Sequence, residues 1–343
     1  MSETLIDILI VVAKIAVVHA VLLTGVAYTV YAERRVSGFI QNRYGPNRVG
    51  PEGLLQPLVD VIKLLLKEDI VPTNANRFIH ALAPGISIVV ALSVFAVIPF
   101  GDTIVLFGKT IKLQIADVNI GLLFILAMLS LGVYGVTLSG WSSNNKYSLL
   151  GGLRSSAQMI SYELSMGLSV LGIIIINGTL ELDTIVQNQY GWQWNIILQP
   201  VGFIIFLVAA FAETNRAPFD LPEAEQELVG GYHTEYSSMK FAMFFLAEYA
   251  AVIVSSALIA TLYLGGWQFP YLQEFGLPPI VVSILQVLTF SVKVMALVFF
   301  FIWVRWSIPR FRYDQLMDLG WKVMLPLALL NLFITSVVIL LLK

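Results

Sequence analysis

Long apolar stretches constrain this chain more than any other feature, because a helix needs about 20 mainly apolar residues to cross a bilayer. Eight stretches meet that requirement, near residues 5–32, 78–100, 119–140, 160–177, 196–212, 241–264, 279–304 and 323–342. Hydrophobic residues make up 58% of the chain and charged residues 12%, whereas soluble domains are about 45–50% apolar and about 25% charged. The sequence therefore predicts an all-α integral membrane protein in which all 343 residues form one membrane domain.

The distribution of basic residues predicts the orientation of the spans. Fifteen of the 20 Lys and Arg residues lie in the loops after the first, third, fifth and seventh spans, whereas the other loops hold two. Because basic loops are retained in the cytoplasm, we expect the odd loops to be cytoplasmic and both termini to lie outside. The first span runs into Glu33, Arg34 and Arg35 instead of a small-residue cleavage site, so we expect it to stay in the membrane.

Composition excludes several kinds of chemistry. The absence of cysteine excludes disulfides, thiolate-held zinc and cysteine-ligated iron–sulfur clusters in this chain. A net charge of −2 leaves no basic surface for nucleic acid. The three histidines, His19, His80 and His233, show no ligand spacing, so we expect no metal or haem site.

The segment after the first span is turn-rich and then amphipathic. Between residues 53 and 67 the polar side chains recur at spacings of one helical turn, at Gln56, Asp60, Lys63 and Lys67. Such a helix is too short and too charged to span, so we expect it to lie at the cytoplasmic membrane surface. A purely structural anchor would show the same pattern.

The loop after the fifth span, residues 213–240, holds six of the 22 acidic residues: Glu213, Asp220, Glu223, Glu225, Glu227 and Glu235. If a helix begins after Pro222, Glu223 and Glu227 lie on one face and repel each other. Burial would add a desolvation penalty, so we expect at least one of these carboxyls to hold a proton near neutral pH. Interleaved apolar residues such as Phe219 favour packing over a solvated acidic loop.

Three ionisable residues lie within the spans themselves. Glu163 and Glu248 are predicted a few residues from the cytoplasmic ends of the fourth and sixth spans, at the level of the acidic loop. Because an ionisable group in hydrocarbon costs about 2.5–3.5 kcal/mol, we expect them to join that loop in one chain of carboxyls. Lys293 is deeper, in the seventh span, and is expected to be a relay member or the partner of an acid.

Several motifs, spread from the first span to the eighth, resemble one family. They are Glu33–Arg35, Gln41–Gly50, the helix at 53–68, Gln158–Glu163, Ala212–Glu227, Glu235–Tyr236 and Pro309–Leu316. The family is the quinone-site membrane subunit of respiratory complex I, which occurs in the bacterial NADH:quinone oxidoreductase and is called subunit 1 in the mitochondrial enzyme. The resemblance covers essentially the whole chain.

This resemblance implies a subunit at the junction of the membrane and hydrophilic arms, in the inner membrane of a bacterium. Its partners would be the hydrophilic-arm subunits that hold the terminal iron–sulfur cluster, the adjacent small membrane subunits and the lipid bilayer. It would frame the tunnel by which a quinone substrate, ubiquinone or menaquinone, leaves the bilayer, and would itself bind neither FMN nor an iron–sulfur cluster.

The same resemblance implies roles for individual residues. A proton-coupling chain of carboxylates would consist of Glu163, Glu213, Asp220, Glu223, Glu225, Glu227, Glu235 and Glu248. Quinone-tunnel and junction roles would fall on Glu33, Arg34, Arg43, Asp60, Lys63, Arg216, Phe219 and Arg310.

Physical chemistry supports the implied coupling, because quinone reduction takes up two protons and creates charge beside the acids. Carboxyls that interact strongly respond to such a charge by changing their protonation together. Two alternatives remain open on the sequence alone. One is the homologous membrane subunit of a hydrogenase or another dehydrogenase, and the other is a stand-alone proton-coupled carrier.

Overall fold

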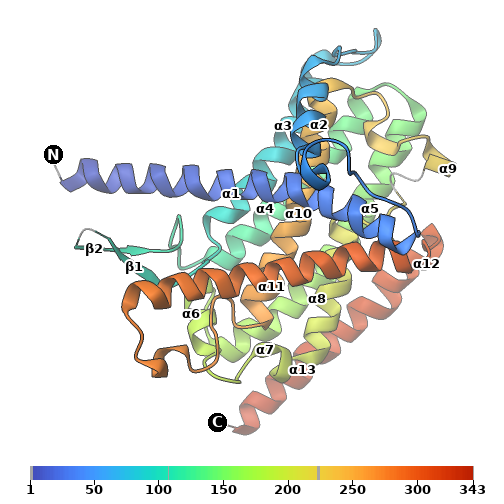
Figure 1. Ribbon diagram of the computed structural model, residues 1–343. Coiled ribbons are helices and arrows are strands. Elements are labelled where there is room, and N and C mark those ends of the chain that lie inside the picture. Colours follow the sequence, from blue (N-terminus) through green and yellow to red (C-terminus); the bar gives the residue numbers. More distant parts are fainter. Residues whose placement is uncertain (1–2, 107, 222–224, 343) are drawn as a thin grey trace.

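The computed structural model describes residues 3–106, 108–221 and 225–342. It consists mainly of helices, which form a bundle crossed on one face by the long helices α1 and α11 (Figure 1). The mostly helical architecture is consistent with the predicted all-α membrane protein. The helices are α1 Glu3–Ile40, α2 Gln56–Leu66, α3 Arg77–Ser93, α4 Gly121–Ser142, α5 Lys146–Asn177, α6 Leu182–Asn188, α7 Asn195–Leu198, α8 Pro200–Glu213, α9 Glu225–Leu228, α10 Ser238–Tyr263, α11 Pro279–Ser307, α12 Tyr313–Asp318 and α13 Leu325–Leu342.

Seven helices in the described ranges are long and apolar enough to cross a membrane. The span predicted near 196–212 differs, because the chain is interrupted between α7 and α8 at Gln199. Pro200 explains the interruption, since proline lacks a backbone N–H and disfavours helical geometry in the preceding residue. The 14 residues of α8 rise only about 21 Å, less than the roughly 30 Å of a hydrocarbon core. The count of eight spans and their orientation therefore stay predictions.

Two helices extend beyond their apolar runs. Helix α1 continues through Glu33 as far as Ile40 instead of ending near residue 32. Helix α5 begins at Lys146, well before residue 160, where the Asn145 side chain accepts a hydrogen bond from the backbone N–H of Tyr147 at 2.9 Å. Glu163 consequently lies in the middle of α5, and its expected place near the cytoplasmic end of the membrane span stays a prediction.

A short β-hairpin interrupts the otherwise helical chain. Strands β1 (Thr103–Leu106) and β2 (Lys109–Lys112) pair antiparallel in the loop after α3. The hairpin is tied to α11, because Ser283 donates a hydrogen bond to the carbonyl of Thr103 at 2.6 Å. It is also tied to the start of α1 through an ion pair between Lys109 and Asp7 at 2.9 Å.

Small residues allow close packing of the central helices. A Cβ atom added at Gly140 of α4 would lie 2.5 Å from the carbonyl oxygen of Ser148 in α5. Close backbone approach of this kind is typical of helix packing in membranes, where small residues replace the hydrophobic driving force. The largest fully buried side chains of the core include Tyr162 of α5 and Phe206 of α8, together with Tyr263 at the end of α10.

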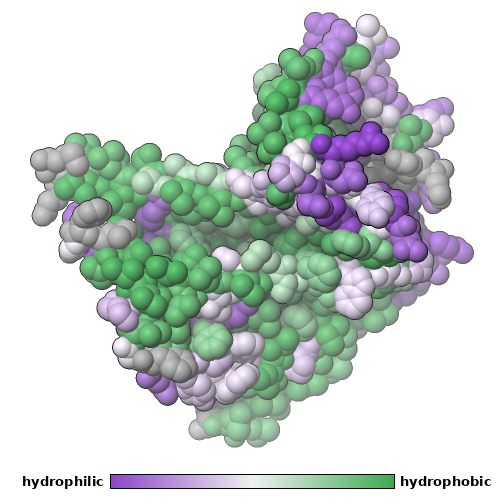
Figure 2. All heavy atoms as spheres, in the orientation of Figure 1, coloured by the Kyte–Doolittle hydropathy of each residue, from purple (hydrophilic) through white to green (hydrophobic). Residues whose placement is uncertain are grey.

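Helix α2 presents an apolar surface that the chain itself leaves uncovered. It begins at Gln56, slightly later than residue 53, and follows a short 3-10 turn at Pro51–Gly53. None of its residues is buried, and Leu58 and Leu65 are 59% and 58% exposed. Figure 2 shows hydrophilic residues gathered around the end of the molecule that holds α2, whereas apolar residues cover the first half of α1 and the body below it.

Candidate functional site

The loop between α8 and α9 is held against α5 by one glutamine. The side-chain amide of Gln158 donates hydrogen bonds to the carbonyls of Ala212 at 2.8 Å and Phe219 at 2.9 Å. It also reaches the side chain of Asn215 at 3.2 Å. These contacts fold the loop into the protein, so that Arg216 and Phe219 are 4% exposed.

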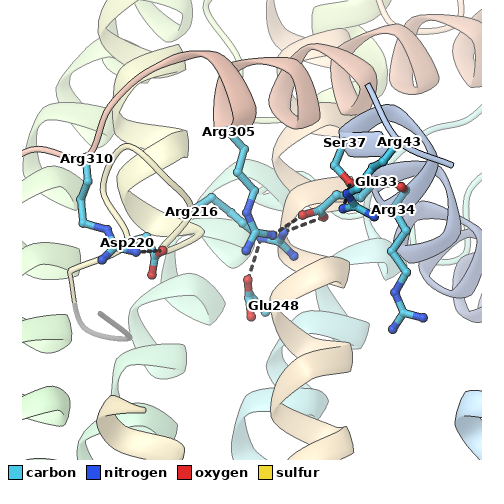
Figure 3. Close-up of polar contacts among 9 residues, drawn as sticks. All are labelled: Glu33, Arg34, Ser37, Arg43, Arg216, Asp220, Glu248, Arg305 and Arg310. Atoms are coloured by element: carbon cyan, nitrogen blue, oxygen red, sulfur yellow. Dashed lines mark hydrogen bonds and ion pairs between the residues drawn. The ribbon is translucent and has the colours of Figure 1, made fainter. Parts of the chain in front are cut away.

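Four charged residues from distant parts of the chain meet beneath this loop, as Figure 3 shows. Arg216 pairs with Glu33 of α1 at 2.9 Å and with Glu248 of α10 at 2.6 Å. Glu33 in turn accepts a hydrogen bond from Arg305, in the last turn of α11. We call Glu33, Arg216, Glu248 and Arg305 the ion-pair network; it joins α1, the acidic loop, α10 and α11.

Arg216 is the centre of the network. Its guanidinium lies over the ring of Tyr249, 3.9 Å from the ring centroid. Burial alone would lower the pKa of Arg216, but the charges of Glu248 and Glu33 outweigh burial, and the pKa is raised. Arg216 is therefore a permanent buried cation between two carboxylates.

A cavity lies beside the network. It has a volume of about 80 Å³, and its lining includes Glu213, Glu248 and Ser87 among mostly apolar side chains. The Oε2 atom of Glu213 is buried and has no hydrogen-bond partner among the described residues. We call this space the acidic cavity. Since an unpaired buried oxygen is costly, the site is suited to ordered water or a proton on Glu213.

Glu163 approaches the acidic cavity from α5. It is half-buried and accepts a hydrogen bond from the hydroxyl of Ser130 in α4. Its charge acts on Glu213. The structure thus brings three of the predicted coupling residues, Glu163, Glu213 and Glu248, to one region inside the bundle.

The remaining described acids of the loop are paired separately and do not form one continuous cluster. Asp220 pairs with Arg310 at 2.7 Å, Glu227 with Arg154 at 2.6 Å, and Glu235 accepts a hydrogen bond from Asn145 at 2.6 Å. Burial raises the pKa of Asp220 even though Arg310 acts in the opposite direction. Glu223 lies outside the described residues, and the structure describes only the backbone of Glu225, in α9.

The predicted tunnel and junction residues divide into two groups. Glu33, Arg216 and Phe219 are buried, and Phe219 packs edge-on against Tyr162, with 5.4 Å between ring centroids. Arg310 pairs with Asp220 of the acidic loop, whereas the remaining four lie on or near α2 and the end of α1. Arg34 pairs with Asp60 at 2.7 Å, Arg43 reaches Gln41 at 2.7 Å, and Lys63 is exposed.

Two contacts of the ion-pair network escape the sequence analysis. Arg305 looks like an ordinary basic residue at a helix end, and Tyr249 looks like a core aromatic, yet both contact members of the network. Lys293 donates to the backbone carbonyls of Leu264, Gly266 and Gln268 at 2.7, 2.9 and 2.7 Å, and so caps the end of α10. The contacts described for it are with these carbonyls and not with an acid, while its expected role as a relay member stays a prediction.

Comparison with known proteins identifies the family. The family model described as NADH dehydrogenase matches residues 13–336. The chain belongs to that family. It is 56% identical to NADH-quinone oxidoreductase subunit 8 of Rhodothermus marinus, over 93% of this chain and 94% of the relative. It is 53% identical to an NADH-quinone oxidoreductase subunit of Geobacter metallireducens, over 99% of this chain and 100% of the relative.

A third relative is also a subunit of NADH-quinone oxidoreductase. It comes from Cytophaga hutchinsonii, and the chain is 52% identical to it over 92% of both chains. The family thus agrees with the resemblance that the motifs carry. The match to the family covers nearly the entire chain, so both the ion-pair network and the acidic cavity lie within the matched region.

Proposed function

We propose that this chain is the quinone-channel subunit of a proton-translocating NADH:quinone oxidoreductase. In that enzyme it carries no redox centre, frames the path of the quinone at the junction with the hydrophilic arm, and couples quinone reduction to proton movement. The observation that carries the proposal is the ion-pair network beside the acidic cavity. Buried charges that contact one another respond together when a charge appears nearby, which is what coupling requires.

The proposed path runs from the loop surface into the bundle. A charge that develops near Glu33 or Asp220 acts first on their arginine partners. Arg216 contacts both Glu33 and Glu248, and Glu248 lines the acidic cavity with Glu213. The proposed coupling between the loop and the acidic cavity therefore passes through Arg216, the buried cation. Glu163 extends this coupling towards α4, where it accepts a hydrogen bond from Ser130. Glu223, Glu225, Glu227 and Glu235 belong to the proposed mouth of this path.

The quinone channel is proposed on the exposed side of α2. The apolar side chains of this helix offer a surface for an isoprenoid tail, while Arg34 and Asp60 give its edge a polar pair. The acidic cavity and the smaller cavity of about 10 Å³ beside Glu33 and Arg305 are both too small for a quinone head group. We therefore propose that partner subunits of the hydrophilic arm and the membrane arm complete the channel.

The proposal includes a location and an orientation. The enzyme would lie in a bacterial inner membrane, with eight spans, both termini outside and the odd loops in the cytoplasm. The names of the relatives support complex I over the membrane subunit of a related hydrogenase. A stand-alone carrier would transport protons when purified alone, whereas this chain should act only with its partners.

Replacement of Glu213 by glutamine tests the coupling role. The Glu213→Gln variant of the assembled enzyme should translocate protons more slowly, because the amide keeps the shape of the side chain but cannot exchange a proton. Proton translocation and quinone reduction would be measured in proteoliposomes. Glu181→Gln is the matched control, since Glu181 lies beyond α5 and its side chain accepts a local hydrogen bond from Thr184 at 2.7 Å. Equal translocation in both variants would remove Glu213 from the path.

Photoaffinity labelling tests the channel. An azido-quinone bound to the assembled enzyme should label this subunit at or near α2 and the end of α1. Label found only in other subunits would contradict the proposed channel.

A further inference from the structure

Ser130 of α4 is the polar partner of a carboxyl that lies inside the bundle. Its hydroxyl contacts the Oε1 atom of Glu163. Glu163 lies near the middle of α5, a helix long and apolar enough to cross a membrane. An ionisable group at such a place needs a partner, because hydrocarbon offers neither hydrogen bonds nor solvation. In the part of the chain that the structure describes, Ser130 meets this need.

Ser130 and Glu163 belong to a regular antiparallel interface between α4 and α5. Seven residues further along α4, the hydroxyl of Thr137 lies 2.5 Å from that of Ser156, which precedes Glu163 by seven residues in α5. Because seven residues are about two helical turns, both pairs lie on one line of contact. The pairs differ in chemistry, since Thr137 and Ser156 are neutral whereas Glu163 can ionise. The Thr137–Ser156 pair is therefore a neutral counterpart of the Ser130–Glu163 pair.

The hydroxyl of Ser130 has two acceptors within reach of one proton. Besides contacting Glu163, its oxygen lies 3.0 Å from the carbonyl oxygen of Leu126, one turn earlier in α4. A serine hydroxyl has a single O–H donor and two acceptor lone pairs. Ser130 can therefore donate fully to the carbonyl or to the carboxylate, but not to both at once.

Each of these two hydrogen bonds suits one protonation state of Glu163. When Glu163 is ionised, Ser130 donates to the carboxylate, and the carbonyl of Leu126 retains the backbone hydrogen bond of the helix. When Glu163 is protonated, its own O–H donates to the oxygen of Ser130, and the proton of Ser130 turns to Leu126. Every donor then has an acceptor in both states. The change requires rotation about one C–O bond and no movement of either helix.

We propose that Ser130 is a positioning residue that stabilises Glu163 in both protonation states, so that Glu163 can gain and lose a proton inside the bundle. Ser130 does not carry this proton; it orients the carboxyl and satisfies its hydrogen bonds in either state. The charge of Glu163 acts on Glu213, whose Oε2 atom has no hydrogen-bond partner among the described residues. This inference rests on the proposed function, because it gives the carboxylate path a supporting residue.

Proton translocation by three variants of the assembled enzyme in proteoliposomes tests this role. Ser130→Ala should translocate protons about tenfold more slowly than the wild type, because ionised Glu163 loses its hydrogen-bond donor. Ser130→Thr should retain translocation, because a threonine hydroxyl can reach the same helical carbonyl. Ser156→Ala is the matched control, since it removes a hydroxyl with a neutral partner from the same interface, and it should also retain translocation.

Infrared difference spectroscopy adds a readout that packing alone would not change. The C=O stretch of protonated Glu163 would be assigned by its absence from Glu163→Gln. Because its frequency rises when the carboxyl loses a hydrogen bond, the band should shift to higher frequency in Ser130→Ala. It should stay near the wild-type frequency in Ser130→Thr and Ser156→Ala. A wild type without such a band would show that Glu163 does not change protonation, and would overturn the proposal.

The variants separate positioning from packing. Unchanged translocation in Ser130→Ala would overturn the proposal, and so would an equal loss in Ser130→Thr or Ser156→Ala. If Ser130→Ala does not assemble, Ser130→Cys replaces it, because a thiol is of similar size but a weaker donor. Slower translocation with a shifted band then supports the proposal, and translocation at the wild-type rate overturns it.

Glu213→Gln in the same membranes distinguishes this inference from the proposed function. If Glu213→Gln slows translocation and Ser130→Ala does not, only the role of Ser130 fails. If neither variant slows translocation, the carboxylate path itself fails. If only Ser130→Ala slows translocation and shifts the band, Glu213 leaves the path and the role of Ser130 stands.

Discussion

Removal of the central cation gives the sharpest test of the ion-pair network. Arg216→Met keeps most of the aliphatic part of the side chain but removes the guanidinium, with its charge and its contact with the ring of Tyr249. In the wild type two carboxylates, Glu33 and Glu248, are balanced by Arg216 and Arg305. The variant leaves this buried group with an excess negative charge.

The geometry sets the size of the expected effect. The ion pairs of Arg216 measure 2.9 and 2.6 Å, which corresponds to an attraction of about 6 kcal/mol each at an effective dielectric constant of about 20. Desolvation of the ions offsets several kcal/mol of that attraction. Because removing one member of a buried pair usually costs about 3–5 kcal/mol, we expect Arg216→Met to destabilise the subunit by that amount.

Thermal inactivation of the assembled enzyme measures this loss. Arg216→Met should inactivate at least about tenfold faster than the wild type at one fixed temperature, since 1.4 kcal/mol corresponds to about a factor of ten. Arg216→Lys should lose less, because it keeps the charge but not the planar guanidinium. The double variant Arg216→Met with Glu248→Gln restores the charge balance and should recover much of the stability.

Two results would refute this account. If Arg216→Met is as stable as the wild type, the network contributes nothing to stability. If the double variant is no more stable than Arg216→Met, the loss comes from packing and the electrostatic explanation is wrong.

Three further predictions address other parts of the structure. Gly151→Ala should destabilise the enzyme by about 1–3 kcal/mol, because its Cβ would lie 2.7 Å from Gly231, whereas Gly167→Ala, which has open space, should inactivate thermally like the wild type. Lys293→Met should cost about 1–3 kcal/mol in the same assay because three partly buried carbonyls lose their donor; a loss no larger than that of the exposed Lys322→Met would contradict the capping role. Since burial raises the pKa of Asp220, its ion pair with Arg310 should be lost on acidification at a higher pH than for an exposed aspartate, near 3.9. An infrared carboxyl band absent from Asp220→Asn would report this protonation, and a midpoint at or below the ordinary value would contradict it.

The long helices could be predicted because a membrane leaves few alternatives. Each spanning segment must satisfy its own backbone hydrogen bonds, so an apolar run of sufficient length becomes a helix. Hydropathy alone does not predict where a helix begins or ends when packing or a proline sets its boundary. Polar residues after position 146 belong to α5 because they are buried against α4 and the acidic loop, and Pro200 divides a run that hydropathy alone treats as continuous.

The candidate site was predicted unevenly. The concentration of acids in residues 213–240 is visible in the sequence, and it directed attention to Glu213 and Arg216. The expectation of one mutually repelling cluster does not describe Asp220, Glu227 and Glu235, because each has its own partner from another element.

Sequence by itself determined that this is a helical membrane protein, which family it resembles and where its charges are concentrated. Only the tertiary structure decided which charges meet. Arg216 and Glu33 are 183 positions apart, and Arg305 and Glu33 are 272 apart. No periodicity or local spacing encodes such a pairing. It arises because the packed helices exclude water from one place, where a charge is stable only when an opposite charge lies within hydrogen-bond distance.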